Sequence, residues 1–374
     1  MCQYRLGIRP AGYRRHARMN SICIKAGAEA FEIIKDGGFN LDKVAAYFAP
    51  AGGPRWLIAS GFDLTLLQGG LLGKNKPVLL AGSSAGAMRF AAWLQPDAAQ
   101  IYRKLIAAYI AMPFHRGDTP PCVFDSFAAV IDAYLEDDAL PFALSDTRYR
   151  LAVITARARH LLTSDIKLIQ RAGLGLSYLM NCFDRSRLYD FLERVVFYTG
   201  AKPPDFCFRK GFRGRYVALN EVNFKHALMA SGAIPLLIAG VHDIYGAPPG
   251  VYRDGGLIDY HLTHRYSVRK GDVTLFFHHQ ERIIPGWLDK RLASRKHAAD
   301  ITNNVLMVYP SREFIAKLPY GRVPDRSDFV TFIDDPEQRM KNWRQSVNQA
   351  APLGEEFLEL LDSGKIREVM ERLD

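Results

Sequence analysis

A serine between two glycines marks where this chain could do covalent chemistry. The pentapeptide at 82–86 reads Gly-Ser-Ser-Ala-Gly, follows an apolar run and leads into a segment with helical character. A buried strand that turns sharply into a helix leaves one side chain at the apex, here Ser84, and glycines allow the tight turn. The first N–H groups of the helix would lie beside that hydroxyl and stabilise an oxyanion. The pattern predicts a nucleophilic serine.

Two other segments are candidates to complete such a site. Gly52 and Gly53 follow a predicted strand, and consecutive glycines can aim backbone N–H groups at one point; Arg55 would brace this loop or add positive potential. Asp254 follows a strand-like segment and precedes two glycines, so its carboxylate could enter a site while the chain turns away. Each segment by itself is equally typical of an ordinary turn.

Four short motifs, taken in order, resemble those of the patatin-like phospholipases. They are Gly-Gly-x-Arg at 52–55, Gly-x-Ser-x-Gly at 82–86, Ala-Ser-x-Ala-x-Pro at 230–235 and Asp-Gly-Gly at 254–256, and the resemblance covers about residues 40–262. It implies a three-layer α/β/α fold with a mainly parallel central sheet. It also implies a catalytic dyad of Ser84 and Asp254. The surrounding positions that it implies are Gly52, Gly53 and Arg55 in the oxyanion loop, Gly82, Ala85 and Gly86 in the nucleophile loop, and Gly255 and Gly256 beside the acid.

The activity implied by the resemblance is lipid acyl hydrolysis of the phospholipase A, lysophospholipase or esterase type. The carboxylate takes the serine proton, the alkoxide attacks an ester carbonyl, and water clears the acyl-enzyme, so no metal or organic cofactor is expected. The chain departs from the family pattern at five places. Pro50, Ala51 and Trp56 stand at positions of Asp, Gly and Gly, and Tyr260 and Leu262 replace Asn and Pro after the acid.

Two other classes of function compete with this hypothesis. A Ser–His–Asp hydrolase would draw its base from the histidines after the acid, which are His261, His264, His278 and His279. A non-catalytic binding protein on a hydrolase fold would use the basic, aromatic segment 209–216. It could also use the apolar segment 283–288 and the cations after it as a membrane anchor.

The composition indicates the kind of partner and the cellular compartment, but not the reaction. The formal net charge of +10 favours an anionic partner, which we take to be a membrane surface rather than nucleic acid. The five scattered cysteines form no Cys-x-x-Cys pair and indicate a reducing compartment. We find no signal peptide and no membrane span, so we expect a cytoplasmic location with peripheral membrane contact.

The predicted organisation is a basic N-terminal extension (1–35), a catalytic domain (36–315) and a C-terminal helical segment (316–374). Strand followed by helix, twice in succession between 44 and 94, is typical of a parallel sheet. We expect residues 98–148 to be mostly helical and to shape an acyl pocket, and we expect a hairpin from 206–208 and 216–219. Further strands are expected at 150–155, 252–253, 273–277 and 305–309.

Overall fold

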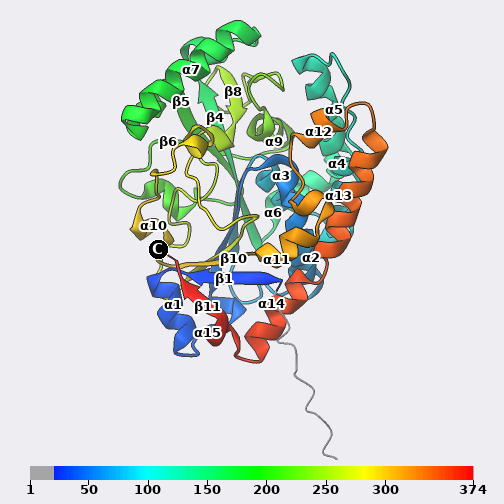
Figure 1. Cartoon of the computed structure of the whole chain (residues 1–374). Helices are drawn as coiled ribbons and strands as arrows, with labels where there is room; N and C mark the ends of the chain where they lie inside the picture. Colours follow the sequence, from blue (N-terminus) through cyan, green and yellow to red (C-terminus); the bar gives the residue numbers. More distant parts are fainter. Residues whose placement is uncertain (1–20, 374) are drawn as a thin grey trace, which may run out of the picture.

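A mixed, mainly parallel β-sheet runs through the molecule and carries the other elements (Figure 1). The computed structural model describes residues 21–373. Its strands are β1 (Ile22–Ala26), β2 (Val44–Ala49), β3 (Val78–Ser83), β4 (Tyr149–Ala158), β5 (Leu192–Tyr198), β6 (Gly214–Ala218), β7 (Val241–His242), β8 (Val251–Asp254), β9 (Val273–Phe277), β10 (Val305–Pro310) and β11 (Met370–Arg372).

The strand order is β11-β1-β10-β9-β2-β3-β4-β5-β6, and β8 joins β4 and β7 beside this path. The central strands from β10 to β4 are parallel, whereas β5 and β8 run antiparallel to β4 and β1 runs antiparallel to β10. The central strands are buried on both faces and read as near-continuous apolar runs, as parallel strands do. The predicted fold class, α/β with a mainly parallel central sheet, is confirmed.

One face of the sheet is covered by helices. Alternate strand residues, among them Tyr47, Leu80, Val153 and Phe277, share one large apolar core with these helices, which Figure 1 shows on one side of the sheet. The α-helices of the described chain are α1 (Ala28–Lys35), α2 (Ser60–Gln68), α3 (Ala85–Trp93), α4 (Ala98–Ala111), α5 (Pro120–Asp132), α6 (Leu140–Ser145), α7 (Lys167–Phe183), α8 (Leu188–Phe191), α9 (Phe224–Gly232), α10 (Ala299–Thr302), α11 (Arg312–Lys317), α12 (Asp328–Thr331), α13 (Pro336–Ala350), α14 (Leu353–Asp362) and α15 (Ile366–Val369).

The opposite face is covered mainly by irregular segments. Phe48 and Phe276 project to this face and pack with Phe206, Leu262 and Tyr266, which come from the chain around 206 and 262–266. The second covering layer of the expected three-layer arrangement is therefore built largely from loops and short 3-10 turns. This leaves the helical face to shape the pocket described below.

The predicted hairpin is wrong. Residues 205–208 form a 3-10 turn, and β6 pairs with β5 in the parallel direction instead of with 206–208. Gly211 lies in the loop that connects them and Gly214 begins β6, while Phe206 is buried in the core on the sheet face rather than in a strand. The helix expected after the first strand of the segment 44–94 begins as a 3-10 helix over Gly53–Ala59 and becomes regular only at α2.

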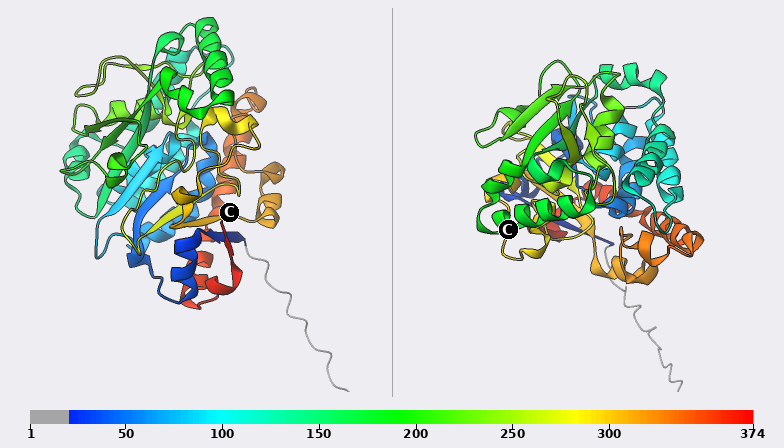
Figure 2. Two further views of the ribbon diagram at one scale, coloured as in Figure 1. Left: turned by 90° about the vertical axis from the view of Figure 1, so that its left-hand side faces the viewer. Right: turned by 90° about the horizontal axis from the view of Figure 1, so that it is seen from above.

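Both ends of the described chain join the sheet. β1 lies between β10 and β11, and β11 pairs with it in the parallel direction. Figure 2 shows the N-terminal and C-terminal elements together at one edge. Residues from all three predicted parts therefore share one sheet. The arginines of the basic N-terminus, up to Arg18, lie outside the described residues. Among residues 21–373, no helix combines the length and apolarity that crossing a membrane needs.

A buried ion pair ties α3 to the helix before it. Arg89 of α3 donates from Nε and Nη2 to the carboxylate of Asp63 on α2, both at 2.9 Å. Tyr47 donates to the same carboxylate at 2.6 Å, and Tyr102 also donates to it. Both charged side chains are fully buried. The network fixes the helix that starts directly after Ser84.

We predict that Asp63→Ala lowers the free energy of unfolding by about 3–5 kcal/mol, because it leaves the Arg89 guanidinium buried without a counter-ion. Urea denaturation followed by circular dichroism measures the change. Asp138→Ala, at an exposed carboxylate, is the matched control and is expected to change stability by no more than about 0.5 kcal/mol. Equal stability of the two variants would contradict the assignment.

Candidate functional site

Two strands that run toward each other bring Ser84 and Asp254 together. β3 runs parallel to β4 and ends with Ser83 opposite Ile154. β8 runs antiparallel to the same edge of β4 and ends with Asp254 opposite Thr155. The last residues of the two strands thus face neighbouring positions of one strand. The Ser84 hydroxyl donates a hydrogen bond to Oδ2 of Asp254 at 2.7 Å.

The backbone at Ser84 is strained, with φ 55° and ψ −127°. A residue with a side chain adopts such a conformation at a cost of about 1–3 kcal/mol, which the surrounding packing must supply. Gly86 makes the turn possible, since a Cβ there would lie 2.2 Å from the carbonyl oxygen of Ala49. Gly82 is needed for a similar reason, because its Cβ would lie 2.5–2.7 Å from the backbone of Gly86 and Ala87.

The main-chain N–H of Ser84 is held by Ser231 of α9. Ser231 Oγ accepts that N–H at 2.8 Å and donates to the carbonyl oxygen of Ile154 at 2.7 Å. The hydroxyl therefore links the nucleophile turn to β4. Ser231 belongs to the Ala-Ser-x-Ala-x-Pro motif at 230–235, but nothing in that motif identified this hydrogen bond.

Asp254 is buried and partly satisfied by hydrogen bonds. Its Oδ1 accepts the N–H of Gly256 at 2.7 Å, and its Oδ2 accepts the Ser84 hydroxyl. Burial raises the pKa of Asp254 to about 6, although these two hydrogen bonds and the positive charges of Arg326 and Lys290 act in the opposite direction. A carboxylate with this pKa is ionised at neutral pH and basic enough to take a proton from a hydroxyl during reaction.

The loop at 51–53 places free N–H groups beside the serine. Gly52, Gly53, Ser84 and Asp254 line one cavity of about 100 Å³. In the described part of the chain the N–H groups of Gly52 and Gly53 have no hydrogen-bond acceptor, whereas that of Ala51 is bound by the carbonyl oxygen of Tyr260 at 2.9 Å. Gly53 has φ +57°, which favours glycine. Such an arrangement can receive an oxyanion.

Arg55 braces the loop rather than pointing freely into the cavity. Its Nε donates to Oδ2 of Asp325 at 2.7 Å, and its Nη2 lies 2.6 Å from the same oxygen. Asp325 belongs to the polar segment before α12, and no motif predicted this segment to lie at a site. The C-terminal part of the chain therefore forms one wall of the cavity.

Two cations at this cavity lack a counter-ion. Lys290 and Arg326 both line it, and neither forms an ion pair with a carboxylate of the described residues. The Lys290 ammonium lies 4.2 Å from the ring centroid of Tyr260. Burial, with repulsion from Arg55 and Arg326, lowers the pKa of Lys290 to about 8. Sequence analysis assigned Lys290 to a surface anchor and did not single out Arg326.

A second, apolar cavity of about 320 Å³ opens beside the same serine. Its walls come from α3, α4, α5, α9 and the start of α12, and Ser84, Gly53, Asp325 and Arg326 also line it. The expectation that residues 98–148 shape a pocket agrees with this geometry. The apolar side chains that line it include Met88, Tyr109, Met112, Phe114, Val123, Phe127, Leu237 and Phe329.

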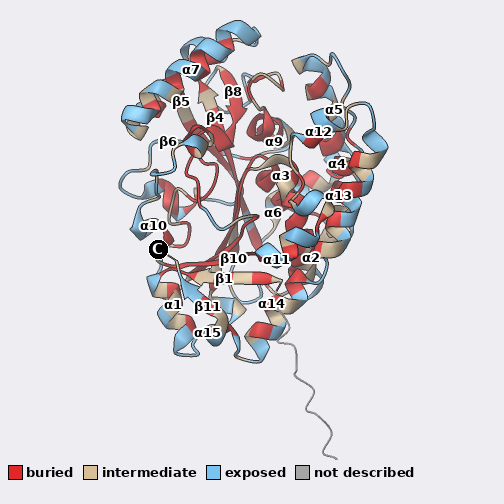
Figure 3. Cartoon of the chain, viewed as in Figure 1, coloured by how far each residue is buried: buried red, intermediate tan, exposed pale blue. Residues whose placement is uncertain are grey.

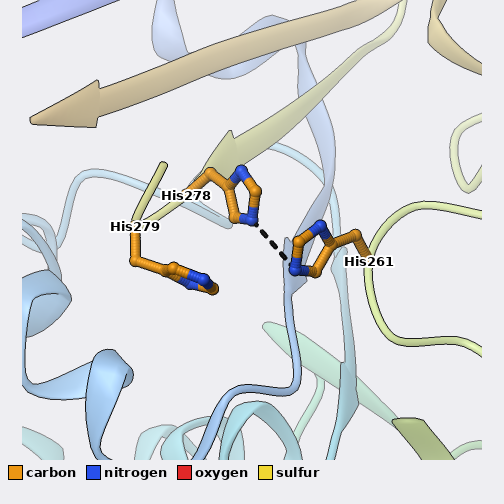
Figure 4. A group of neighbouring side chains, drawn as sticks. All are labelled: His261, His278 and His279. Atoms are coloured by element: carbon orange, nitrogen blue, oxygen red, sulfur yellow. Dashed lines mark hydrogen bonds between the residues drawn. The ribbon is translucent and has the colours of Figure 1, made fainter. Parts of the chain in front are cut away.

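Three buried histidines lie under the loop at 51–53 (Figure 4). His278 Nε2 and His261 Nε2 are 3.2 Å apart, and a Cβ at Gly52 would lie 3.2 Å from Cε1 of His279. Burial lowers the pKa of all three imidazoles, to about 3 for His278, so they are neutral. No histidine of the described chain hydrogen-bonds to Ser84, which weakens the hypothesis of a Ser–His–Asp triad.

The ring nitrogens of these histidines lie within 4.8 Å of one another, close enough to suggest a metal ion. The proton positions argue otherwise. His261 Nδ1 accepts the N–H of Ile284 at 2.8 Å, so a neutral His261 carries its proton on Nε2, the atom that faces His278. That nitrogen has no lone pair for a metal. The group fits a hydrogen-bonded support for the loop better than a ligand set.

The fourth histidine considered as a base, His264, lies elsewhere. It stacks on Phe206 at the loop-covered face of the sheet, with its Nε2 4.0 Å from Asp259. Burial lowers its pKa to about 3. It is part of the packing around the buried Arg194–Asp259 ion pair.

Comparisons with known proteins add little to this geometry. No protein-family model matches the chain, and no curated protein matches it. Among solved structures, the chain is similar to the crystal structure of VipD from Legionella pneumophila, with 12% sequence identity and a TM-score of 0.32, over 95% of this chain and 72% of that one. A similarity of this size assigns neither a family nor an activity.

We predict that Gly255→Ala disrupts the meeting of β3 and β8. The added Cβ would lie 2.0 Å from the carbonyl oxygen of Ile154 and 2.5 Å from Ser83 Oγ, which should lower stability by about 3 kcal/mol. Gly175→Ala is the control, because its Cβ meets nothing within 4 Å on the exposed side of α7, and it should stabilise by up to about 1 kcal/mol. Thermal denaturation of both variants measures the difference, and shifts of the same sign would contradict the geometry.

Proposed function

We propose that the protein is a serine acyl-ester hydrolase of the patatin-like type, acting on lipids through Ser84 and Asp254. The observation that carries the proposal is the direct 2.7 Å hydrogen bond from the serine hydroxyl to a buried carboxylate, at the end of a strained strand–helix turn. The order of the four sequence motifs supports the family assignment, and the cavities beside the serine support an acyl substrate.

The chemistry follows from the positions of the groups. As Ser84 Oγ attacks the ester carbonyl, its proton passes to Asp254, and the N–H groups of Gly52 and Gly53 receive the oxyanion. The protonated Asp254 then gives its proton to the departing alcohol, leaving an acyl-serine. Water, deprotonated by the same carboxylate, attacks that ester and restores the hydroxyl. No step needs a group that the chain does not supply.

The two cavities suggest how a lipid would be divided. The apolar cavity suits an acyl chain, since its walls are mainly aliphatic and aromatic and Ser84 is one of its lining residues. The polar cavity suits the alcohol side of the ester. Lys290, which lines only this cavity of the two, and Arg326, which lines both, favour an alcohol that carries a negative charge, such as the phosphate of a phospholipid.

We predict that the protein hydrolyses p-nitrophenyl esters and prefers medium or long acyl chains over acetate. Ser84→Ala should remove the activity, and Asp254→Asn should lower kcat by about 10²–10⁴-fold, since an amide cannot take the proton. Mass spectrometry after treatment with a fluorophosphonate should locate one adduct on Ser84. An inert wild type, or activity that survives Ser84→Ala in a folded variant, would favour the non-catalytic binding function instead.

The pH profile tests the role of the acid separately. Because the carboxylate must be ionised to accept the serine proton, kcat/KM should rise about tenfold per pH unit below a midpoint near 6 and level off above it. Asp254→Asn should remove this limb from any residual rate. A profile without an inflection between pH 5 and 7 would argue against a carboxylate base.

A further inference from the structure

The burial pattern of α7 is the reverse of that of an ordinary surface helix. Its inward positions include the polar residues Gln170, Ser177 and Asn181, which are buried. Large apolar side chains lie outside: Leu168 is 76% exposed, Leu179 56% and Phe183 84%. Figure 3 shows the outer surface of this helix as exposed. A soluble helix would normally turn its apolar side inward.

The exposed apolar residues form one continuous stripe. Positions 168, 172, 176, 179 and 183 are separated by four, four, three and four residues, so they lie on one side of an α-helix. Ile166 and Ile169 extend the stripe at its N-terminal end and are also exposed. We define this set, Ile166, Leu168, Ile169, Ala172, Leu176, Leu179 and Phe183, as the α7 face.

Hydrogen bonds of the buried polar residues fix this orientation. Gln170 donates from Nε2 to the carbonyl oxygen of Ser164 at 2.8 Å and accepts the N–H of Leu236. Asn181 donates to Oδ1 of the buried Asp289 at 2.7 Å. Turning the apolar stripe inward would break these bonds and leave buried polar groups unpaired. The helix is therefore held with its apolar stripe outward.

The charge around the α7 face is positive. The helix contains Lys167 and Arg171, both exposed, and no acidic residue. Of the acids that flank it, Asp165 pairs with Arg253 at 2.8 Å, and the charge of Asp184 is offset by the neighbouring Arg187 and Arg213. An apolar stripe edged by free cations is complementary to a lipid surface with anionic headgroups.

The inner side of α7, opposite the α7 face, adjoins the wall of the candidate active site. Gln170 holds the backbone of Leu236, and Leu174 of α7 belongs to the same apolar cluster as Leu236 and Trp287. Ile234, Pro235 and Trp287 in turn line the polar cavity at Ser84. α7 is thus packed, through its inner side, against the segment that lines the polar cavity, while the α7 face stays exposed.

We infer that the α7 face docks the protein on an anionic membrane surface. This differs from the anchor expected at 283–288, because Ile283, Ile284 and Leu288 are buried and cannot enter a bilayer. A second copy of this chain is the alternative occupant, which the experiment below separates from a membrane surface.

Sedimentation with vesicles tests the inference without turnover. The Ser84→Ala protein should sediment with vesicles of phosphatidylcholine and phosphatidylglycerol, and adding Leu179→Ser and Phe183→Ser should lower binding about tenfold or more. Lys167→Ala with Arg171→Ala should lower binding to these vesicles several-fold, with little change on phosphatidylcholine alone. Val222→Ser with Tyr245→Ser, at side chains 59% and 65% exposed, is the matched control and should bind unchanged.

Because binding is measured on a protein without its nucleophile, the result does not depend on the proposed activity. Loss of binding in the α7 variants but not in the control supports the inference, provided that all variants keep the same melting temperature. Equal binding by the α7 variants and the control would overturn it. So would the absence of vesicle binding together with a dimer, seen by gel filtration, that Phe183→Ser dissociates.

Discussion

The candidate site depends on β4, which serves as a common edge for two strands of opposite direction. β3 pairs with the first half of β4 and β8 with the second, so their last residues face Ile154 and Thr155. The proposed proton transfer needs the Ser84 hydroxyl and the Asp254 carboxylate at hydrogen-bond distance from each other. Gly255 lets β8 approach to that point, and Ser231 ties the turn to the carbonyl of Ile154. The geometry of the pair is thus a property of the sheet rather than of the two loops.

The two faces of the same sheet are covered differently, one by helices and the other by irregular segments. The helical face supplies the walls of an apolar cavity at Ser84, while the other face is filled by Phe206, Leu262 and Tyr266 from irregular segments. Of the three buried, neutral histidines beside the loop at 51–53, His261 and His278 are hydrogen-bonded to each other. The N–H of Ala51, the residue before the two glycines of this loop, donates to the carbonyl oxygen of Tyr260.

Sequence patterns predicted the elements that have strong local signals. The apolar run before Ser84 and the glycines around it predicted β3, the turn and α3, and the runs at 273–277 and 305–309 predicted β9 and β10. The prediction of a hairpin was wrong because Phe206 packs against the face of the sheet, and a buried apolar residue of this kind gives the same sequence pattern as a strand. Asp325 and Arg326 could not be predicted as part of the site, since only the folded chain brings a polar stretch some 70 residues past Asp254 to the cavity. The orientation of α7 was hidden in the same way, because periodicity shows a stripe but not which side faces water.

The pairing at the sheet edge also constrains how the chain reaches its folded state. β1 forms near the start of the described chain, but its partners β10 and β11 are almost the last strands to be made, and the N–H of Ser21 is bound by Glu356, 335 residues away. Contacts of such sequence separation form late and slow folding. During synthesis on the ribosome, β1 must therefore wait with both edges unpaired for nearly the whole chain, the period in which an exposed strand is most prone to aggregate and most in need of a chaperone.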